Sequence, residues 1–125
     1  MNKEHGDYHL EWQGDLLILS LSGSFNEIAI TRFFQQVMGS FRSRSDRPWV
    51  LLSSLDKEMI GTPAVLDIIK TAYRWGEQHQ CKAAAISGAN IVINQLYLSF
   101  FEELSYPARI FEKKDDAVNW LSEQL

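Results

Sequence analysis

The residues of this chain that could do chemistry are hydroxyls and a carboxylate placed where predicted strands and helices meet. Ser53, Ser54 and Asp56 follow a buried apolar run, Ser87 ends a second run, and Thr62 precedes a helical pattern. Because ligand sites on parallel sheets gather at the carboxyl ends of the strands, we expect these groups to lie together at one edge. Helix N-termini at that edge offer free N–H groups and partial positive charge, which favour an anion or a phosphorylated side chain.

Plainer roles for the same residues stay open. Thr62 and Ser24 have the positions of N-caps, and a capping hydroxyl needs no further function. Asp56 and Glu58 share one loop and could form a general acid–base pair, but such a pair needs a pocket and a shifted pKa. The sequence indicates neither, so we predict no catalytic residues and no enzyme.

Metal ligands and nucleophiles are sparse. His5 and His9 lie four residues apart, but the pattern around them indicates a tail and a strand rather than a helix. Cys81, the single cysteine, is expected to be a small buried residue without reactivity. Phosphate-binding loops, dinucleotide fingerprints and nucleophile elbows are absent from the sequence. We therefore predict no metal site and no cofactor.

The elements that must position these groups follow from hydrophobic periodicity. Strands are predicted at 8–12, 16–21, 49–52, 82–87 and 108–111, with helices beginning near residues 24, 63, 91 and 115. The order ββαβαβαβα, a hairpin followed by alternation, indicates an α/β sandwich with a mixed five-stranded sheet and four helices. At 125 residues the chain is expected to form a single domain, 1–125.

Helix starts are predicted from capping chemistry. Thr62 followed by proline is a strong start signal, because the hydroxyl accepts an orphan N–H and proline loses no hydrogen bond there. Ser24 and Glu27 have the spacing of a capping box. Asp115 or Asp116 is expected to cap the last helix.

The third helix, predicted at 91–104, is apolar on more than one side. Its inward stripe is predicted to comprise Ile93, Leu96, Tyr97, Phe100, Phe101 and Leu104. Val92 and Leu98 lie off this stripe, so they indicate further core, a homodimer contact or a site for an apolar ligand. Arg42, Arg44 and Arg47, in a loop before the central strand, form either a phosphate or partner patch or a solvated loop.

Composition narrows the class of protein. The net charge of −4 argues against binding of a nucleic-acid backbone. No apolar run is long enough to span a membrane. The first residues lack the apolar centre of a signal peptide, so we expect a cytoplasmic protein.

Several segments together resemble a known family. The stretch FEKKDDAVNWL at 111–121 resembles the ending of the SpoIIAA-like branch of the STAS fold: Phe, an acidic cap, then Ala-x-x-Trp-Leu. The unit 49–70 and the alanine-rich strand before Ser87 also fit that branch. STAS domains are named for sulfate transporters and anti-sigma factor antagonists. The resemblance implies a STAS-like sandwich and a regulatory, protein-binding role.

In anti-sigma factor antagonists of that family, the central helix is headed by Asp-Ser-Ser-Gly with a phosphorylatable serine. The matching segment here is Ile60-Gly61-Thr62-Pro63, which keeps a hydroxyl at Thr62 but lacks the family's Asp and Gly around it. We therefore predict a non-enzymatic regulatory or protein-interaction module, anti-sigma factor antagonist-like, with a regulatory protein or a second copy as partner. The alternative is a binder of an apolar or anionic small molecule, such as a lipid-like ligand, as the related fold of lipid-transfer proteins suggests.

Overall fold

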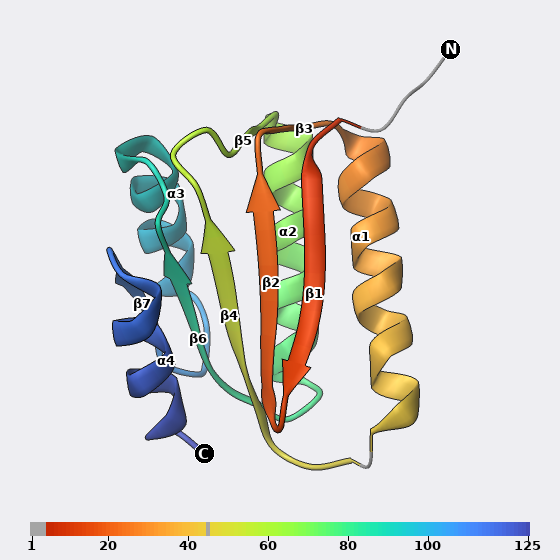
Figure 1. Cartoon of the computed structure of the whole chain (residues 1–125), viewed down its shortest axis with the longest axis vertical. Helices are drawn as coiled ribbons and strands as arrows, with labels where there is room; N and C mark the ends of the chain where they lie inside the picture. The colour runs from red at the N-terminus through yellow and green to blue at the C-terminus, as the bar shows by residue number, and fades with distance from the viewer. Residues whose placement is uncertain (1–4, 45) are drawn as a thin grey trace.

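The computed structural model describes residues 5–44 and 46–125, and its centre is a five-stranded sheet (Figure 1). The strands lie in the order β1-β2-β4-β6-β7, with β1 and β2 antiparallel and every later neighbouring pair parallel. The elements are β1 (Asp7–Gln13), β2 (Leu16–Ser22), β3 (Ser24–Phe25), α1 (Glu27–Ser40), the 3-10 turn η1 (Phe41–Ser43), β4 (Trp49–Leu55), β5 (Ile60–Gly61), α2 (Pro63–Glu77), β6 (Cys81–Ser87), α3 (Ile91–Phe101), β7 (Ala108–Phe111) and α4 (Lys114–Ser122). The predicted α/β class and mixed five-stranded sheet are confirmed.

The helices cover the two faces of the sheet unequally. Side chains of α1, α2 and α3 form the larger core on one face, whereas Ala117 and Leu121 of α4 pack against the other. The parallel connections all step across the sheet in the same direction, and right-handed crossovers then place their three helices on one side. In Figure 1, α2 accordingly lies behind the strands.

Strand β4 contributes to both cores because it is covered on both faces. Val50 and Leu52 are fully buried against the α4 side, and the residue between them faces the larger core. A continuous apolar run is typical of such a strand. The strand nevertheless continues through Ser53 and Ser54 to Leu55, because parallel pairing with β2 and β6 satisfies the backbone whatever the side chains are. The prediction that these serines follow the strand is therefore wrong.

Two asparagines are the N-caps of helices for which we predicted a different cap or no cap. The Asn26 side chain accepts a hydrogen bond from the Ala29 N–H at 3.0 Å, and Asn90 accepts one from the Ile93 N–H at 2.9 Å. The predicted capping box at Ser24 is therefore wrong. That residue lies in β3, which pairs in parallel with β5 in a small second sheet. A two-residue pairing of this kind leaves no hydrophobic period in the sequence.

The last two helices differ from prediction at their ends. Helix α4 begins at Lys114 without a side-chain cap, so the predicted aspartate cap is wrong. Asp115 and Asp116 lie instead in its first turn, where their charge still favours the positive end of the helix. Helix α3 ends at Phe101, three residues before the predicted Leu104.

Candidate functional site

The loop after β4 lies at the carboxyl edge of the parallel strands and is held there by Asp56. Its carboxylate accepts hydrogen bonds from the Ser22 hydroxyl at the end of β2 and from the Glu58 N–H, the latter at 3.1 Å. The bond from Ser22 is the main cause that lowers the pKa of Asp56 below its ordinary value. Asp56 is therefore ionised at neutral pH and acts as an acceptor that shapes the loop.

A second set of bonds joins this loop to the start of α3. The Asn90 side chain donates to the carbonyl oxygens of Lys57 at 3.0 Å and Met59 at 3.3 Å. In return, the Lys57 ammonium donates to the Ala89 carbonyl at 2.8 Å. Sequence reasoning gave Asn90 no role, although an asparagine directly before an apolar helical pattern is a preferred N-cap.

Thr62 lies exposed at the N-cap of α2, as predicted. Its hydroxyl accepts a hydrogen bond from the Val65 N–H at 3.3 Å, and proline occupies the first helical turn. Gly61 approaches α2 so closely that a Cβ there would lie 2.7 Å from the Val65 side chain. The first turn of α2 carries no acidic residue, so no side chain within that turn neutralises the positive end of the helix.

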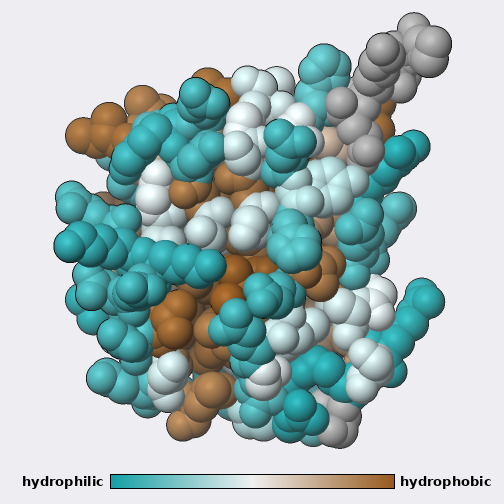
Figure 2. All heavy atoms as spheres, in the orientation of Figure 1, coloured by the Kyte–Doolittle hydropathy of each residue, from teal (hydrophilic) through white to brown (hydrophobic). Residues whose placement is uncertain are grey.

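Large apolar side chains are exposed around the same edge. Ile60 is 53% exposed, and Ile91 and Val92 at the start of α3 are 72% and 60% exposed. The bond between Asn90 and the Met59 carbonyl brings these two segments together. Figure 2 shows brown, hydrophobic residues protruding at the upper left, where Figure 1 places the start of α3. We call Ile60, Ile91 and Val92 the apolar edge.

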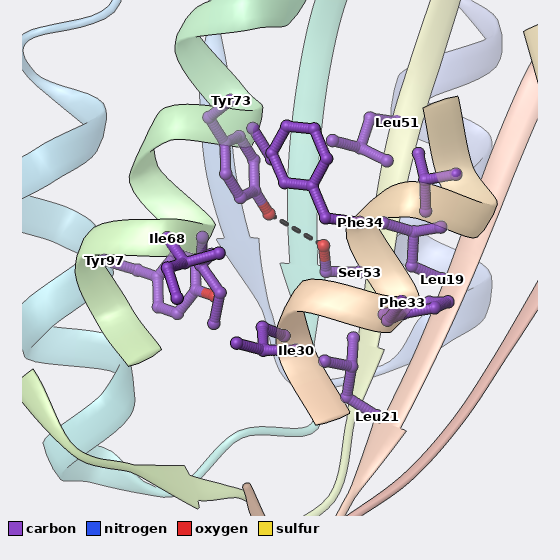
Figure 3. A pocket seen from close by; sticks show the side chains of 13 residues that line it. Leu19, Leu21, Ile30, Phe33, Phe34, Leu51, Ser53, Ile68, Tyr73 and Tyr97 are labelled. Atoms are coloured by element: carbon purple, nitrogen blue, oxygen red, sulfur yellow. Dashed lines mark hydrogen bonds between the residues drawn. The ribbon is translucent and has the colours of Figure 1, made fainter. Parts of the chain in front are cut away.

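Ser53 lies in the larger core and not at the edge. Its hydroxyl oxygen is 2.7 Å from the hydroxyl oxygen of Tyr73 on α2, and both residues are buried (Figure 3). Burial raises the pKa of Tyr73 far above its ordinary value, so its hydroxyl stays protonated. The sequence analysis overlooked Tyr73, which continues the helical spacing of Val65 and Ile69.

Ser54 and Ser87 lie on the opposite face of the sheet. They are register partners on β4 and β6 and turn toward the α4 side, because neighbouring residues of a strand alternate between faces. Ser87 is buried, and its hydroxyl has no hydrogen-bond partner within the described part of the chain. The five predicted site residues are thus divided. Asp56 and Thr62 flank the edge loop, Ser53 faces the larger core, and Ser54 and Ser87 face the α4 side of the sheet.

Solved structures with this arrangement resemble the chain over nearly its whole length. An uncharacterised DUF3478-family protein with a SpoIIAA-like fold from Shewanella loihica PV-4 has a TM-score of 0.71 and 16% identity, with 97% of each chain covered.

This chain has a SpoIIAA-like fold.

Two further structures share it. An anti-sigma factor antagonist from Mycobacterium paratuberculosis has a TM-score of 0.65 and 12% identity, covering 94% of this chain and 95% of that one. A chain in the structure of diguanylate cyclase SiaD in complex with its activator SiaC, from Pseudomonas aeruginosa, has a TM-score of 0.62 and 16% identity, covering 90% and 96%. No family profile and no curated protein matches the chain by sequence.

The arginines lie at the opposite end of this SpoIIAA-like domain. Arg44 and Arg47 each donate to one oxygen of Asp15 in the β1–β2 turn, both at 2.6 Å. The bond from Arg47 is the largest cause that lowers the pKa of Asp15. The Arg44 guanidinium also lies 4.1 Å from the centre of the Trp12 ring. These two arginines therefore anchor the hairpin turn; Ser45, between them, lies outside the described residues.

The described residues give little support to a metal site or a reactive cysteine. No group of three or more His, Cys, Asp or Glu side chains in ranges 5–44 and 46–125 is placed to hold a metal ion. Cys81 is 5% exposed, which confirms the prediction of a buried residue, and this burial raises the pKa of its thiol to about 12. No helix in these ranges is both long and apolar enough to cross a membrane.

Proposed function

We propose that this protein is a non-enzymatic regulatory module that binds a protein partner through the apolar edge and Thr62. The observation that carries the proposal is the exposure of three large apolar side chains at the edge of the sheet where the exposed Thr62 begins α2. Protein interfaces combine such an apolar centre with a polar surround. Two proteins of similar fold, an anti-sigma factor antagonist and a chain from an activator complex, support a protein partner.

Thr62 is the residue through which such binding would be regulated. A phosphoryl group there would add about two negative charges at neutral pH. The positive end of α2 would favour it, and Glu58, which is exposed nearby, would oppose it. Because a charged group within an interface must be desolvated, we expect phosphorylation to change partner affinity and leave the fold intact.

A capture experiment tests the edge. The immobilised protein is incubated with cell lysate, and bound proteins are compared by mass spectrometry for wild type, the double variant Ile60→Asp/Ile91→Asp and Thr62→Glu. Leu125→Asp is the matched control. Leu125 is 57% exposed, and Figure 1 shows the C-terminus at the end of the molecule opposite the start of α3. We expect wild type and control to retain a common protein that the double variant loses. Equal capture by all four proteins would contradict the proposal.

A second copy of the chain is the competing occupant of the apolar edge. Sedimentation equilibrium of the wild type and of Ile91→Asp distinguishes the two. A dimer that dissociates in the variant would assign the edge to self-association, whereas a monomer in both cases supports a different protein as partner. Circular dichroism should be unchanged, since Ile91 is 72% exposed and contributes little to the core.

A further inference from the structure

A hollow that the proposed function does not use lies between the segment 41–49 and the end of α2. Figure 1 shows the connection between α1 and β4 at the lower end of the molecule, opposite the start of α3. The hollow is open to solvent in part, and its volume is about 170 Å³. An apolar cavity of about 150 Å³ takes up benzene, so a six-membered ring fits in this hollow.

Three aromatic side chains line the hollow and hold one another in place. The Phe41 ring packs edge-to-face on Trp49 and on Trp75, with ring centres 4.9 Å apart in both pairs. The imidazole of His79 stacks on Trp75 with ring centres 3.9 Å apart, and the Trp49 indole N–H donates to the His79 carbonyl oxygen. Because aromatic rings favour edge-to-face and offset contacts with one another, this lining favours an aromatic ligand over an aliphatic one of equal size.

The charged residues that line the hollow favour an anion. They are Arg44 and Arg47 against the single carboxylate of Asp46, which already accepts a hydrogen bond from the Gln80 side chain. Asp15, which pairs with both arginines, does not line the hollow. An anion bound there would therefore meet two guanidinium groups, although the charge of Asp15 offsets part of theirs and limits the affinity.

Arg44 keeps hydrogen-bonding capacity that the described residues do not use. A guanidinium carries five N–H donors, and Arg44 donates to Asp15 through Nη2. Its Nε is buried and has no hydrogen-bond partner in ranges 5–44 and 46–125. The Arg44 side chain is 9% exposed and that of Arg47 46%, so a carboxylate beside both keeps part of its hydration. A planar carboxylate suits this pair, because its two oxygens match the fork of guanidinium donors.

We propose that this hollow binds a small aromatic carboxylate. The ring lies against Phe41, Trp49 and Trp75, and the carboxylate accepts hydrogen bonds from Arg44 and Arg47. The aromatic contacts are already formed before binding, so little side-chain freedom is lost when the ligand arrives. The site lies at the other end of the domain from the apolar edge, so its occupant does not depend on a protein partner at that edge.

The test titrates the protein with benzoate and follows the tryptophan indole N–H signals by nuclear magnetic resonance. We expect saturable shifts at Trp49 and Trp75, with a dissociation constant on the order of millimolar, and no shift at Trp120 on the α4 side. Benzamide, with the same ring but no charge, should bind about fivefold more weakly. Cyclohexanecarboxylate, which keeps the charge but lacks the aromatic ring, should bind about threefold more weakly. Equal affinity of benzoate and either analogue, or no saturable shift, would overturn the proposal.

A pair of arginine variants places the carboxylate. Arg47→Gln should weaken benzoate binding about fivefold, because it replaces a charged donor by a neutral one, and should change benzamide binding much less. Arg42→Gln is the matched control, since Arg42 is exposed in the same segment but does not line the hollow. Equal weakening by both substitutions would show a general effect of charge and refute the site. Arg47 also donates to Asp15, so circular dichroism checks the fold; if Arg47→Gln does not fold, the three compounds on the wild type decide.

Discussion

Replacement of Gly88 by alanine should destabilise the edge of the sheet strongly. Gly88 follows β6 with φ of +81°, and a Cβ there would lie 2.2 Å from the carbonyl oxygen of Leu55 at the end of β4. The positive φ alone costs an L residue about 1–2 kcal/mol. Relieving the overlap requires movement of backbone, which adds about 1–3 kcal/mol. We therefore expect Gly88→Ala to lower the free energy of unfolding by about 2–5 kcal/mol.

Gly23→Ala is the matched control for this prediction. Gly23 has nearly the same φ, +83°, but a Cβ there would meet no atom within 4 Å. It should therefore lose only the backbone contribution, about 1–2 kcal/mol. Urea unfolding of the wild type and both variants at one temperature gives the three free energies, and the difference between variants isolates the contact with Leu55. Equal losses would show that β4 and β6 do not pack this closely at the edge.

Three further predictions concern buried and charged groups. Ser53→Ala should lower the free energy of unfolding by about 1–3 kcal/mol, because it leaves the buried Tyr73 hydroxyl unpaired. Adding Tyr73→Phe should restore most of the lost stability. Strictly additive losses for the two substitutions in urea unfolding would contradict this prediction. The folded pKa of Asp56 lies below its unfolded value of about 3.9, so its stabilisation is complete above that value and disappears as pH falls through the folded pKa. Asp56→Ala should therefore unfold at lower urea than wild type at about pH 7, and this gap should close well below about pH 3; a gap independent of pH would refute the reasoning. With its pKa raised to about 12, Cys81 should not react with a thiol reagent at about pH 8 until urea is added, and rapid labelling of the native protein would contradict its burial.

Much of the fold could be predicted because its signals are local. The apolar run around Val50 indicated a strand buried on both faces, and the last strand has the predicted bounds, 108–111. Thr62 with the following proline located the start of α2, because capping depends on residues within one turn. Leu96 shows the limit of this approach. It follows the predicted inward stripe of α3 but is 43% exposed, because the spacing along a helix does not say how far the elements packed on it extend.

The candidate site was predicted less well, because it depends on contacts between distant segments. Ser53 and Ser54 were grouped with Ser87 by their position after apolar runs, but strand alternation and register send Ser53 to one face and the other two to the opposite face. Asn90 was overlooked because its role depends on where the loop containing Met59 passes.

The sequence by itself determined the order of the four helices and of the five strands of the main sheet, the parallel pairing that alternation requires, and the hydroxyl at the head of the central helix. These properties follow from hydrophobic period and capping, which act over a few neighbouring residues. Only the tertiary structure decided that Ser53 meets Tyr73, that Tyr97 from a third helix lies beside them, and that Asn90 bonds to the Met59 carbonyl. The reason is that each of these neighbours belongs to a separate element, and their distances depend on how the helices pack on the sheet.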